Sequence, residues 1–152
     1  MIGNPKKLIA WLLDQDKEKL FEVKQHREKR SLNANAYAWS LIGKMADVLR
    51  TSKESVYREM LRSYGQSEIV SVLSNIDVNG YFKYFDEAGK ANLNGKEFTH
   101  YHVYKGSSEY DTIEMSILID GIISECREMD IETLPEHEIE RLKNTWGDVK
   151  NE

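Results

Sequence analysis

The chain has 152 residues, of which 40% are apolar and 31% are charged, and its formal net charge is −5 at pH 7. This length predicts a single domain over residues 1–152, and the apolar content excludes an intrinsically disordered chain. The longest apolar run, LIAWLL, is much shorter than the roughly 20 residues of a membrane span. The basic start MIGNPKK lacks the apolar stretch of a signal peptide, and one cysteine allows no internal disulfide. We therefore expect a cytoplasmic protein that does not enter the membrane.

The charges are distributed unevenly along the chain. Residues 1–108 contain 17 Lys and Arg against 13 Asp and Glu, a net charge of +4, whereas residues 109–152 contain four against 13, a net charge of −9. Two interpretations remain open. The acidic part is either a pair of solvated helices without a binding role, or it lies apart from a basic surface that binds an anionic partner.

The first half of the chain predicts three helices and one strand. A helix is expected over residues 5–14, because an Asn-Pro pair precedes it and suits a helix start. The alternation of apolar and polar residues in LFEVKQH, residues 20–26, indicates a strand. A central helix follows to about residue 49, with Ser31 as its cap. Thr51 and Glu54 have the spacing of a capping box and open the third helix.

The second half predicts a sheet and two further helices. Residues 66–106 contain β-branched and aromatic runs, EIVSVL, YFKYF and EFTHYHVYKG, with two Asn-Gly pairs of the hairpin type between them. Asp111 and Glu114 form another capping box, and apolar periodicity behind it predicts the two closing helices. The whole pattern predicts an α+β fold, in which a small and mostly antiparallel sheet is packed with about five helices.

A basic run precedes the central helix. Within KQHREKR, residues 24–30, the cationic side chains are Lys24, Arg27, Lys29 and Arg30. A helix N-terminus offers free N–H groups and partial positive charge, which suit phosphate, and the amide of Asn35 can bond a phosphate or a base edge. Trp39 lies on the apolar stripe of the helix, so it either stacks on a base or belongs to the core. The alternative interpretation of the run is a solvated basic turn.

Aromatic and basic residues are also interleaved in the middle of the chain. The candidates for base stacking and phosphate contact there are Tyr81, Lys83, Tyr84, Tyr101 and Lys105. Exposed rings stack on bases of any sequence, and each stacked base contributes about 1–3 kcal/mol. The alternative is that these rings fill the core or are ordinary strand residues.

Two histidines raise the question of a metal. His100 and His102 are two residues apart, so on a strand they point to the same face and can ligate a metal with a third ligand from elsewhere. The chain otherwise has no phosphate-binding loop, no GxGxxG, CxxC or GxSxG motif, and no nucleophile and base at a recognisable spacing. We therefore expect a protein that is not an enzyme and that uses no metal or other cofactor.

The stretch RSLNANAYAW, residues 30–39, resembles the RSLxxNxxxW signature of the NinB (Orf) family of bacteriophage recombination proteins. The preceding basic segment and the acidic C-terminal helix that ends in Trp-Gly-Asp are also similar. The resemblance implies a single NinB-like domain over residues 1–152, an α+β fold of the RAGNYA type and a homodimer without metal or nucleotide. In that family pattern Ser31 caps the helix, Asn35 orders its first turns, and Arg30 faces DNA or a carboxylate.

The same resemblance implies a function. NinB proteins are recombination mediators that bind single-stranded DNA and help load a recombinase onto strands coated by the host single-strand-binding protein. We therefore expect a phage-derived mediator that acts in the host bacterial cytoplasm. Two alternatives remain: a non-enzymatic protein-interaction module that targets a host factor, and a metal-dependent nuclease that uses His100 and His102.

Overall fold

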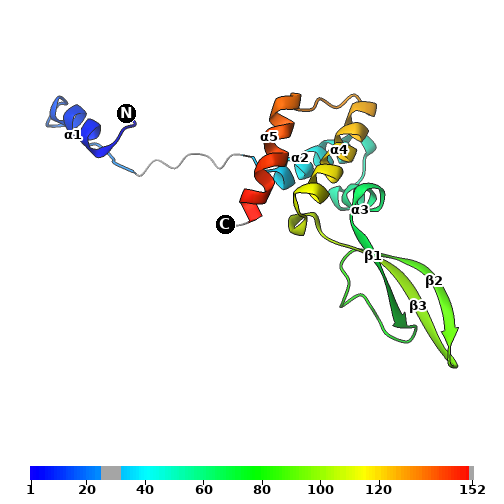
Figure 1. Cartoon of the computed structure of the whole chain (residues 1–152). Helices are drawn as coiled ribbons and strands as arrows, with labels where there is room; N and C mark the ends of the chain where they lie inside the picture. The colour runs from blue at the N-terminus through cyan, green and yellow to red at the C-terminus, as the bar shows by residue number, and fades with distance from the viewer. Residues whose placement is uncertain (25–31, 151–152) are drawn as a thin grey trace. The chain divides into compact units, whose positions relative to one another are not determined.

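The computed structural model describes residues 1–24 and 32–150, and the chain divides into two compact units, Met1–Ser31 and Leu32–Glu152 (Figure 1). Each unit is described on its own. The expectation of a single domain over residues 1–152 stays a prediction. None of the helices in the described residues is long and apolar enough to cross a membrane.

The N-terminal unit is built on one short helix, α1 (Pro5–Leu13), which begins where the sequence predicted. The ring of Trp11 packs edge-on against Phe21, with the ring centroids 5.6 Å apart. Residues Leu20–Lys24 form no strand, so the strand predicted over residues 20–26 is wrong wherever the structure describes it. Alternating side chains are not sufficient for a strand, because its backbone groups also need a hydrogen-bonded neighbour.

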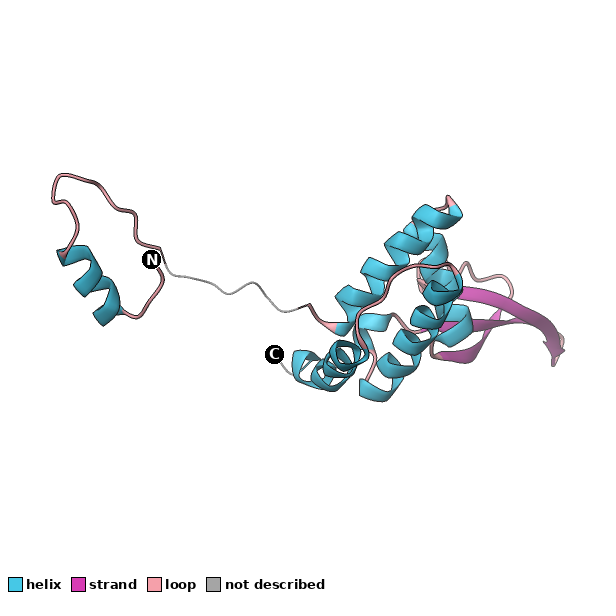
Figure 2. Cartoon of the chain, turned by 90° about the horizontal axis from the view of Figure 1, so that it is seen from above, coloured by secondary structure: helices cyan, strands magenta, loops and turns pink. Residues whose placement is uncertain are grey.

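Four helices form the core of the second unit: α2 (Ala34–Leu49), α3 (Lys53–Tyr64), α4 (Thr112–Glu128) and α5 (Glu136–Lys150). Helix α2 packs against the other three, which confirms the predicted central helix, and α4 also packs against α3 and α5. The buried apolar side chains form one cluster, whose largest fully buried members include Tyr110, Leu41, Ile42, Met45, Leu61 and Met115. Figure 2 shows these helices gathered together, with the strands extending from them.

Side-chain caps begin α2, α3 and α4, and the caps of α2 and α3 are not the predicted residues. Asn33 caps α2, because its Oδ1 accepts from a backbone N–H of the first turn at 2.8 Å. The expected cap, Ser31, lies outside the described residues. Ser52 caps α3 instead of Thr51, with a bond of 3.1 Å to its Oγ. The predicted capping box at the start of α4 is confirmed, with both reciprocal bonds present.

Three strands, β1 (Ser67–Leu73), β2 (Phe85–Leu93) and β3 (Lys96–Tyr104), form an antiparallel sheet in the order β1-β3-β2. Asn94 and Gly95 make the two-residue turn between β2 and β3, and both have positive φ, as this kind of hairpin requires. The predicted α+β fold, a small antiparallel sheet with five helices, is therefore confirmed over the residues that the structure describes.

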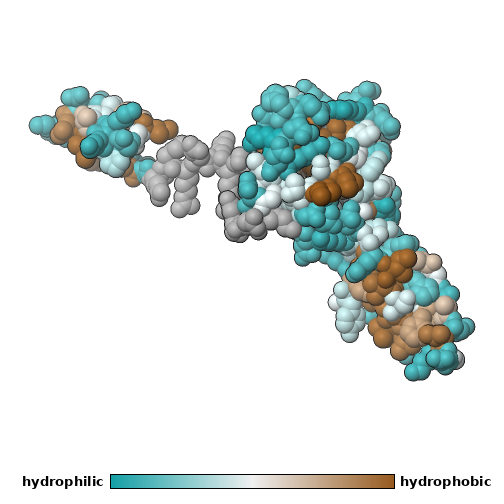
Figure 3. Space-filling view, viewed as in Figure 1, coloured by the Kyte–Doolittle hydropathy of each residue, from teal (hydrophilic) through white to brown (hydrophobic). Residues whose placement is uncertain are grey.

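One face of the sheet is covered by the connection from β1 to β2, residues 74–84. These two strands lie at opposite edges, so the connection must cross β3. Val78 is buried in this crossing, and the ring of Phe82 packs against those of Phe85 and Tyr101. The other face is more open, and apolar side chains are visible on the surface of the part of the chain that carries the strands (Figure 3).

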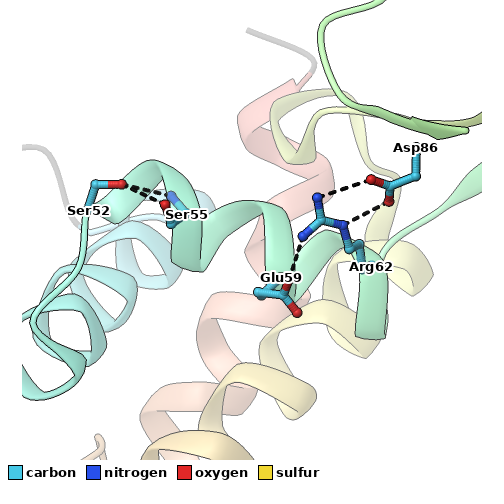
Figure 4. A network of polar contacts seen from close by, with 5 residues as sticks. All are labelled: Ser52, Ser55, Glu59, Arg62 and Asp86. Carbon is cyan, nitrogen blue, oxygen red and sulfur yellow. Dashed lines mark hydrogen bonds and ion pairs between the residues drawn. The ribbon is translucent and has the colours of Figure 1, made fainter.

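A polar network joins helix α3 to the base of the sheet (Figure 4). Arg62 donates to both carboxylate oxygens of Asp86, at 2.8 and 3.1 Å, and also contacts Glu59. A bidentate pair of this kind restricts both distance and orientation. The hydrogen bonds from Arg62 also hold the pKa of the Asp86 carboxyl below its ordinary value. The network therefore ties the end of α3 to the start of β2.

Candidate functional site

A groove of about 470 Å³ lies where α2, α3, the connection before β2 and the end of β3 meet. We call it the α2–β3 groove, and its lining residues are Asn35, Trp39, Tyr57, Lys83, Tyr84, Tyr104, Lys105, Gly106, Ser107, Ser108 and Glu109. It gathers four of the residues that the sequence predicted for nucleic-acid binding, from positions up to 70 apart in the chain. Trp39, the residue whose role the sequence left open, lines the same groove.

A chain of hydrogen bonds forms one wall of the groove. Tyr57 donates its hydroxyl proton to Ser107 Oγ at 2.9 Å, and Ser107 Oγ donates in turn to Asn35 Oδ1 at 2.6 Å. The backbone N–H of Ser107 closes the cycle by donating to the Tyr57 hydroxyl at 2.8 Å. Ser107 is only 1% exposed, so its polar groups need these partners. The chain holds the segment after β3 against the first turn of α2.

This chain of hydrogen bonds uses only the oxygen of the Asn35 side-chain amide. The carbonyl oxygen of Asn35 accepts from Ser107, and no partner for its amide nitrogen is present among the described residues. Asn35 is half-buried and lines the groove, so the amide can donate hydrogen bonds to a bound group. Asn33, and not Asn35, caps the helix, and the expectation that Asn35 orders the first turns of α2 stays a prediction.

Three rings form the aromatic part of the groove. Trp39 stacks on Tyr57 with centroids 4.2 Å apart, and Tyr57 meets Tyr84 edge-on at 5.3 Å. Trp39 is half-buried: it packs against the core, as one interpretation predicted, and it also lines the groove. Stacking of a base on Trp39 stays a prediction. Tyr84 is 8% exposed, so the expectation of an exposed stacking ring at this position is wrong. Its ring is needed to support Tyr57 from the side.

Positive charge in the groove comes mainly from Lys83. Its Nζ lies 5.3 Å from the centroid of the Tyr84 ring, and it makes no ion pair within the described residues. The Nζ of Lys105 lies 3.1 Å from Glu114, so part of its charge is neutralised. The two lysines come from opposite sides of the sheet's base and both line the groove.

The other predicted site residues lie elsewhere. Tyr81 is 79% exposed in the turn before β2, and Tyr101 packs against Phe82 on the covered face of the sheet. Lys24 belongs to the N-terminal unit, where its Nζ lies 3.2 Å from Glu22. The remaining predicted cations, which lie outside the described residues, are Arg27, Lys29 and Arg30.

Among the described residues, no side chains are placed to complete a metal site with the histidine pair. His100 Nδ1 shares a hydrogen bond of 2.6 Å with Ser71 Oγ, and both residues lie on facing positions of β1 and β3. His102 faces Asp86 across β2 and β3, but that carboxylate is bonded to Arg62. Within residues 1–24 and 32–150, no three His, Cys, Asp or Glu side chains are grouped so that they could hold a metal.

The division into units changes the interpretation of the charge pattern. Residues 1–31 carry eight basic and five acidic side chains, a net charge of +3, whereas residues 32–152 carry 13 and 21, a net charge of −8. The basic excess that the sequence assigned to residues 1–108 therefore belongs mostly to the N-terminal unit. A polyanion would meet a net positive charge in residues 1–31, and in the second unit it would meet a local positive charge at Lys83 in the groove.

Tyr57 and Ser107 are among the groove residues that sequence reasoning missed. Tyr57 lies on the apolar stripe of α3 and looks like any core residue. The KGSS segment has the composition of a turn before the next helix. One signal was present: a Gly-Ser-Ser run next to a basic residue, at the end of an aromatic strand, offers small polar groups at a place where chain segments meet.

The chain matches no protein-family model, and neither a curated protein nor a solved structure matches it. The function is therefore argued from the geometry and chemistry of the α2–β3 groove.

Proposed function

We propose that the chain binds single-stranded DNA through the α2–β3 groove and that it acts without catalysis. The observation that carries this proposal is the meeting of three kinds of group in one concavity: the indole of Trp39, the amide nitrogen of Asn35 and the ammonium of Lys83. Neither the amide nitrogen nor the ammonium has a hydrogen-bond or ion-pair partner among the described residues. A nucleotide presents a ring, polar base edges and a phosphate, and each of these has a partner in the groove.

The single strand is favoured over the duplex for a physical reason. A base must leave its stack before a ring such as Trp39 can contact its face, and in a single strand this unstacking costs little free energy. Asn35 then donates to a base edge or a phosphate oxygen, and Lys83 neutralises a phosphate. The net charge of −8 on residues 32–152 opposes binding that relies on charge alone, such as non-specific attachment to a duplex.

The basic N-terminal segment contributes electrostatic attraction. Its net charge of +3 includes four of the residues predicted to contact DNA, which are Lys24, Arg27, Lys29 and Arg30. Phosphate contacts of this kind release counterions, so the affinity falls as salt rises. In this proposal the segment raises the rate and strength of capture, and the groove supplies the preference for unstacked bases.

The role in recombination rests on the resemblance to NinB proteins. In that role the protein is a phage-derived recombination mediator, a homodimer in the host bacterial cytoplasm, whose partners are a recombinase and the host single-strand-binding protein. The proposed mechanism needs no metal and no nucleotide.

A protein-interaction module is the second candidate function, favoured by a specific observation. Large apolar side chains are exposed over the short N-terminal unit, among them Ile2, Ile9, Leu13, Leu20 and Val23. Within its described residues, 1–24, the unit has no buried side chain, and a segment this short does not bury enough apolar surface to be stable alone. Such a unit fits the apolar groove of another protein.

Fluorescence anisotropy with labelled single-stranded and duplex DNA, at low and moderate salt, tests the proposal. We expect salt-sensitive binding that prefers the single strand and is weakened in Lys83→Ala. Lys96→Ala is the matched control, because Lys96 is an exposed lysine at the far end of the sheet. An equal loss of DNA affinity in Lys83→Ala and Lys96→Ala, or no binding at low salt, would reject the groove as the DNA-binding site. Either result would favour the protein-interaction module. Loss of the label only with magnesium would instead indicate the nuclease.

A further inference from the structure

Strand β1 lies at one edge of the sheet (Figure 1), and among the described residues no strand pairs with its outer side. Backbone hydrogen bonds of 3.0 Å at Gln66 and Ser74 tie the two ends of the strand to the β3 side. Antiparallel ladders alternate, so every second residue between these two faces β3 and the others face outward. The N–H and C=O groups of Ile69 and Ser71 therefore point away from the sheet. Among the described residues, none bonds to them there.

The two edges of the sheet are protected to different degrees. Edge strand β2 has a bulge between Glu87 and Gly89, and Gly89 has a φ of +139°, which interrupts regular pairing. Strand β1 has seven residues in unbroken register with β3, no proline and one charged side chain, Glu68. Natural sheets usually blunt an exposed edge with charges, prolines or bulges. The unprotected edge of β1 is thus a template for another strand.

We propose that β1 pairs antiparallel with β1 of a second copy of the chain, about a two-fold axis at Val70. In this register Ile69 of one copy lies opposite Ser71 of the other, and each pair exchanges the free N–H and C=O groups. Glu68 lies opposite Val72 of the second copy, so no like charges meet. Val70 meets its own counterpart, and β-branched pairs favour strand pairing. The product is a continuous six-stranded sheet with closed two-fold symmetry.

The edge suits a second copy because it is complementary to itself. The outward N–H groups of Ile69 and Ser71 in one copy donate to the outward carbonyl groups of Ser71 and Ile69 in the other. The one charged side chain of each strand, Glu68, does not face the Glu68 of the second copy. The contact is only one strand wide, so it buries less than the roughly 1,200 Å² of a stable, specific interface. The dimer is therefore reversible and depends on protein concentration. This inference uses no residue of the α2–β3 groove, so it can fail while DNA binding in the groove holds, and it supplies an interface for the homodimer of the proposed function.

Sedimentation velocity of the full chain over a wide concentration range tests the proposal. The mass should rise from 17.7 kDa toward twice that value as the concentration increases. Ile69→Pro should remain monomeric, because it removes an outward N–H and leaves the bonds between β1 and β3 intact. Ile69→Lys should also remain monomeric. The matched control is Ile113→Lys on α4, where the isoleucine is 73% exposed compared with 66% for Ile69.

Backbone amide exchange adds a residue-level measurement. The amide protons of Ile69 and Ser71 should exchange at least tenfold more slowly in the dimer than in the monomer. A wild-type chain that stays monomeric at every concentration would overturn the proposal and assign the edge to a strand of a different protein. Dimers that persist in both Ile69 variants would overturn it in favour of another face. If Ile69→Pro loses its circular dichroism signal, Ile69→Lys alone decides.

Discussion

Replacing Ser107 by alanine should lower the free energy of unfolding, because Ser107 bonds both to Tyr57 on α3 and to Asn35 on α2. The change removes the acceptor for the Tyr57 hydroxyl, 2.9 Å away, and the donor to Asn35 Oδ1, 2.6 Å away. Each intramolecular hydrogen bond contributes about 0.5–1.5 kcal/mol, and a buried polar group left without a partner costs about 1–3 kcal/mol. Two bonds at a site this buried predict a loss of about 2–3 kcal/mol in the free energy of unfolding.

Urea denaturation followed by circular dichroism measures this loss directly. The neighbouring Ser108 is exposed, so Ser108→Ala should change the free energy of unfolding by less than about 0.5 kcal/mol. Tyr57→Phe combined with Ser107→Ala should lose less than the sum of the two single variants, because both remove the same bond. Equal stability of Ser107→Ala and Ser108→Ala would refute the reasoning, as would strict additivity with Tyr57→Phe.

Two further predictions concern the junction between helices and sheet. Arg62 lowers the pKa of Asp86, so ionised Asp86 stabilises the fold above the ordinary carboxyl pKa of about 4, and this contribution is lost as the pH falls from there through the lowered pKa of the folded state. The difference in urea midpoint between wild type and Asp86→Asn should therefore be largest at pH 7 and shrink steadily as the pH is lowered below about 4, whereas a constant separation would contradict the assignment. A Cβ at Gly65 would lie 2.6 Å from a backbone oxygen, so Gly65→Ala should cost about 1–3 kcal/mol. Gly80→Ala, with no atom within 4 Å, should be nearly neutral, and equal effects at both glycines would contradict the packing argument.

Local signals made much of the fold predictable. The turn at Asn94 and Gly95 depends on a two-residue preference for positive φ, and the capping box at the start of α4 depends on a spacing of three. Both are contained in a few neighbouring residues. The strand expected at residues 20–26 failed because alternation says nothing about whether a neighbouring strand is present to pair with it.

The candidate site was predictable only in part. Asn35, Lys83 and Lys105 were chosen for their chemistry, and tertiary packing brings them to one groove. Tyr84 was predicted to stack on a base because it is a tyrosine, but its burial depends on contacts with α3 that the sequence does not reveal. Ser107 could not be assigned a partner, because the bond to Asn35 joins residues 72 apart.

The most direct test of the central claim is photocrosslinking of the full chain to a single-stranded oligonucleotide that contains 5-iododeoxyuridine. This base crosslinks to aromatic side chains that it stacks on, and peptide mass spectrometry then locates the contact. The account predicts a crosslink at Trp39, weakened in Asn35→Ala and Lys83→Ala and unchanged in Lys96→Ala. Crosslinks confined to residues outside the α2–β3 groove, or no crosslink at all, would contradict it.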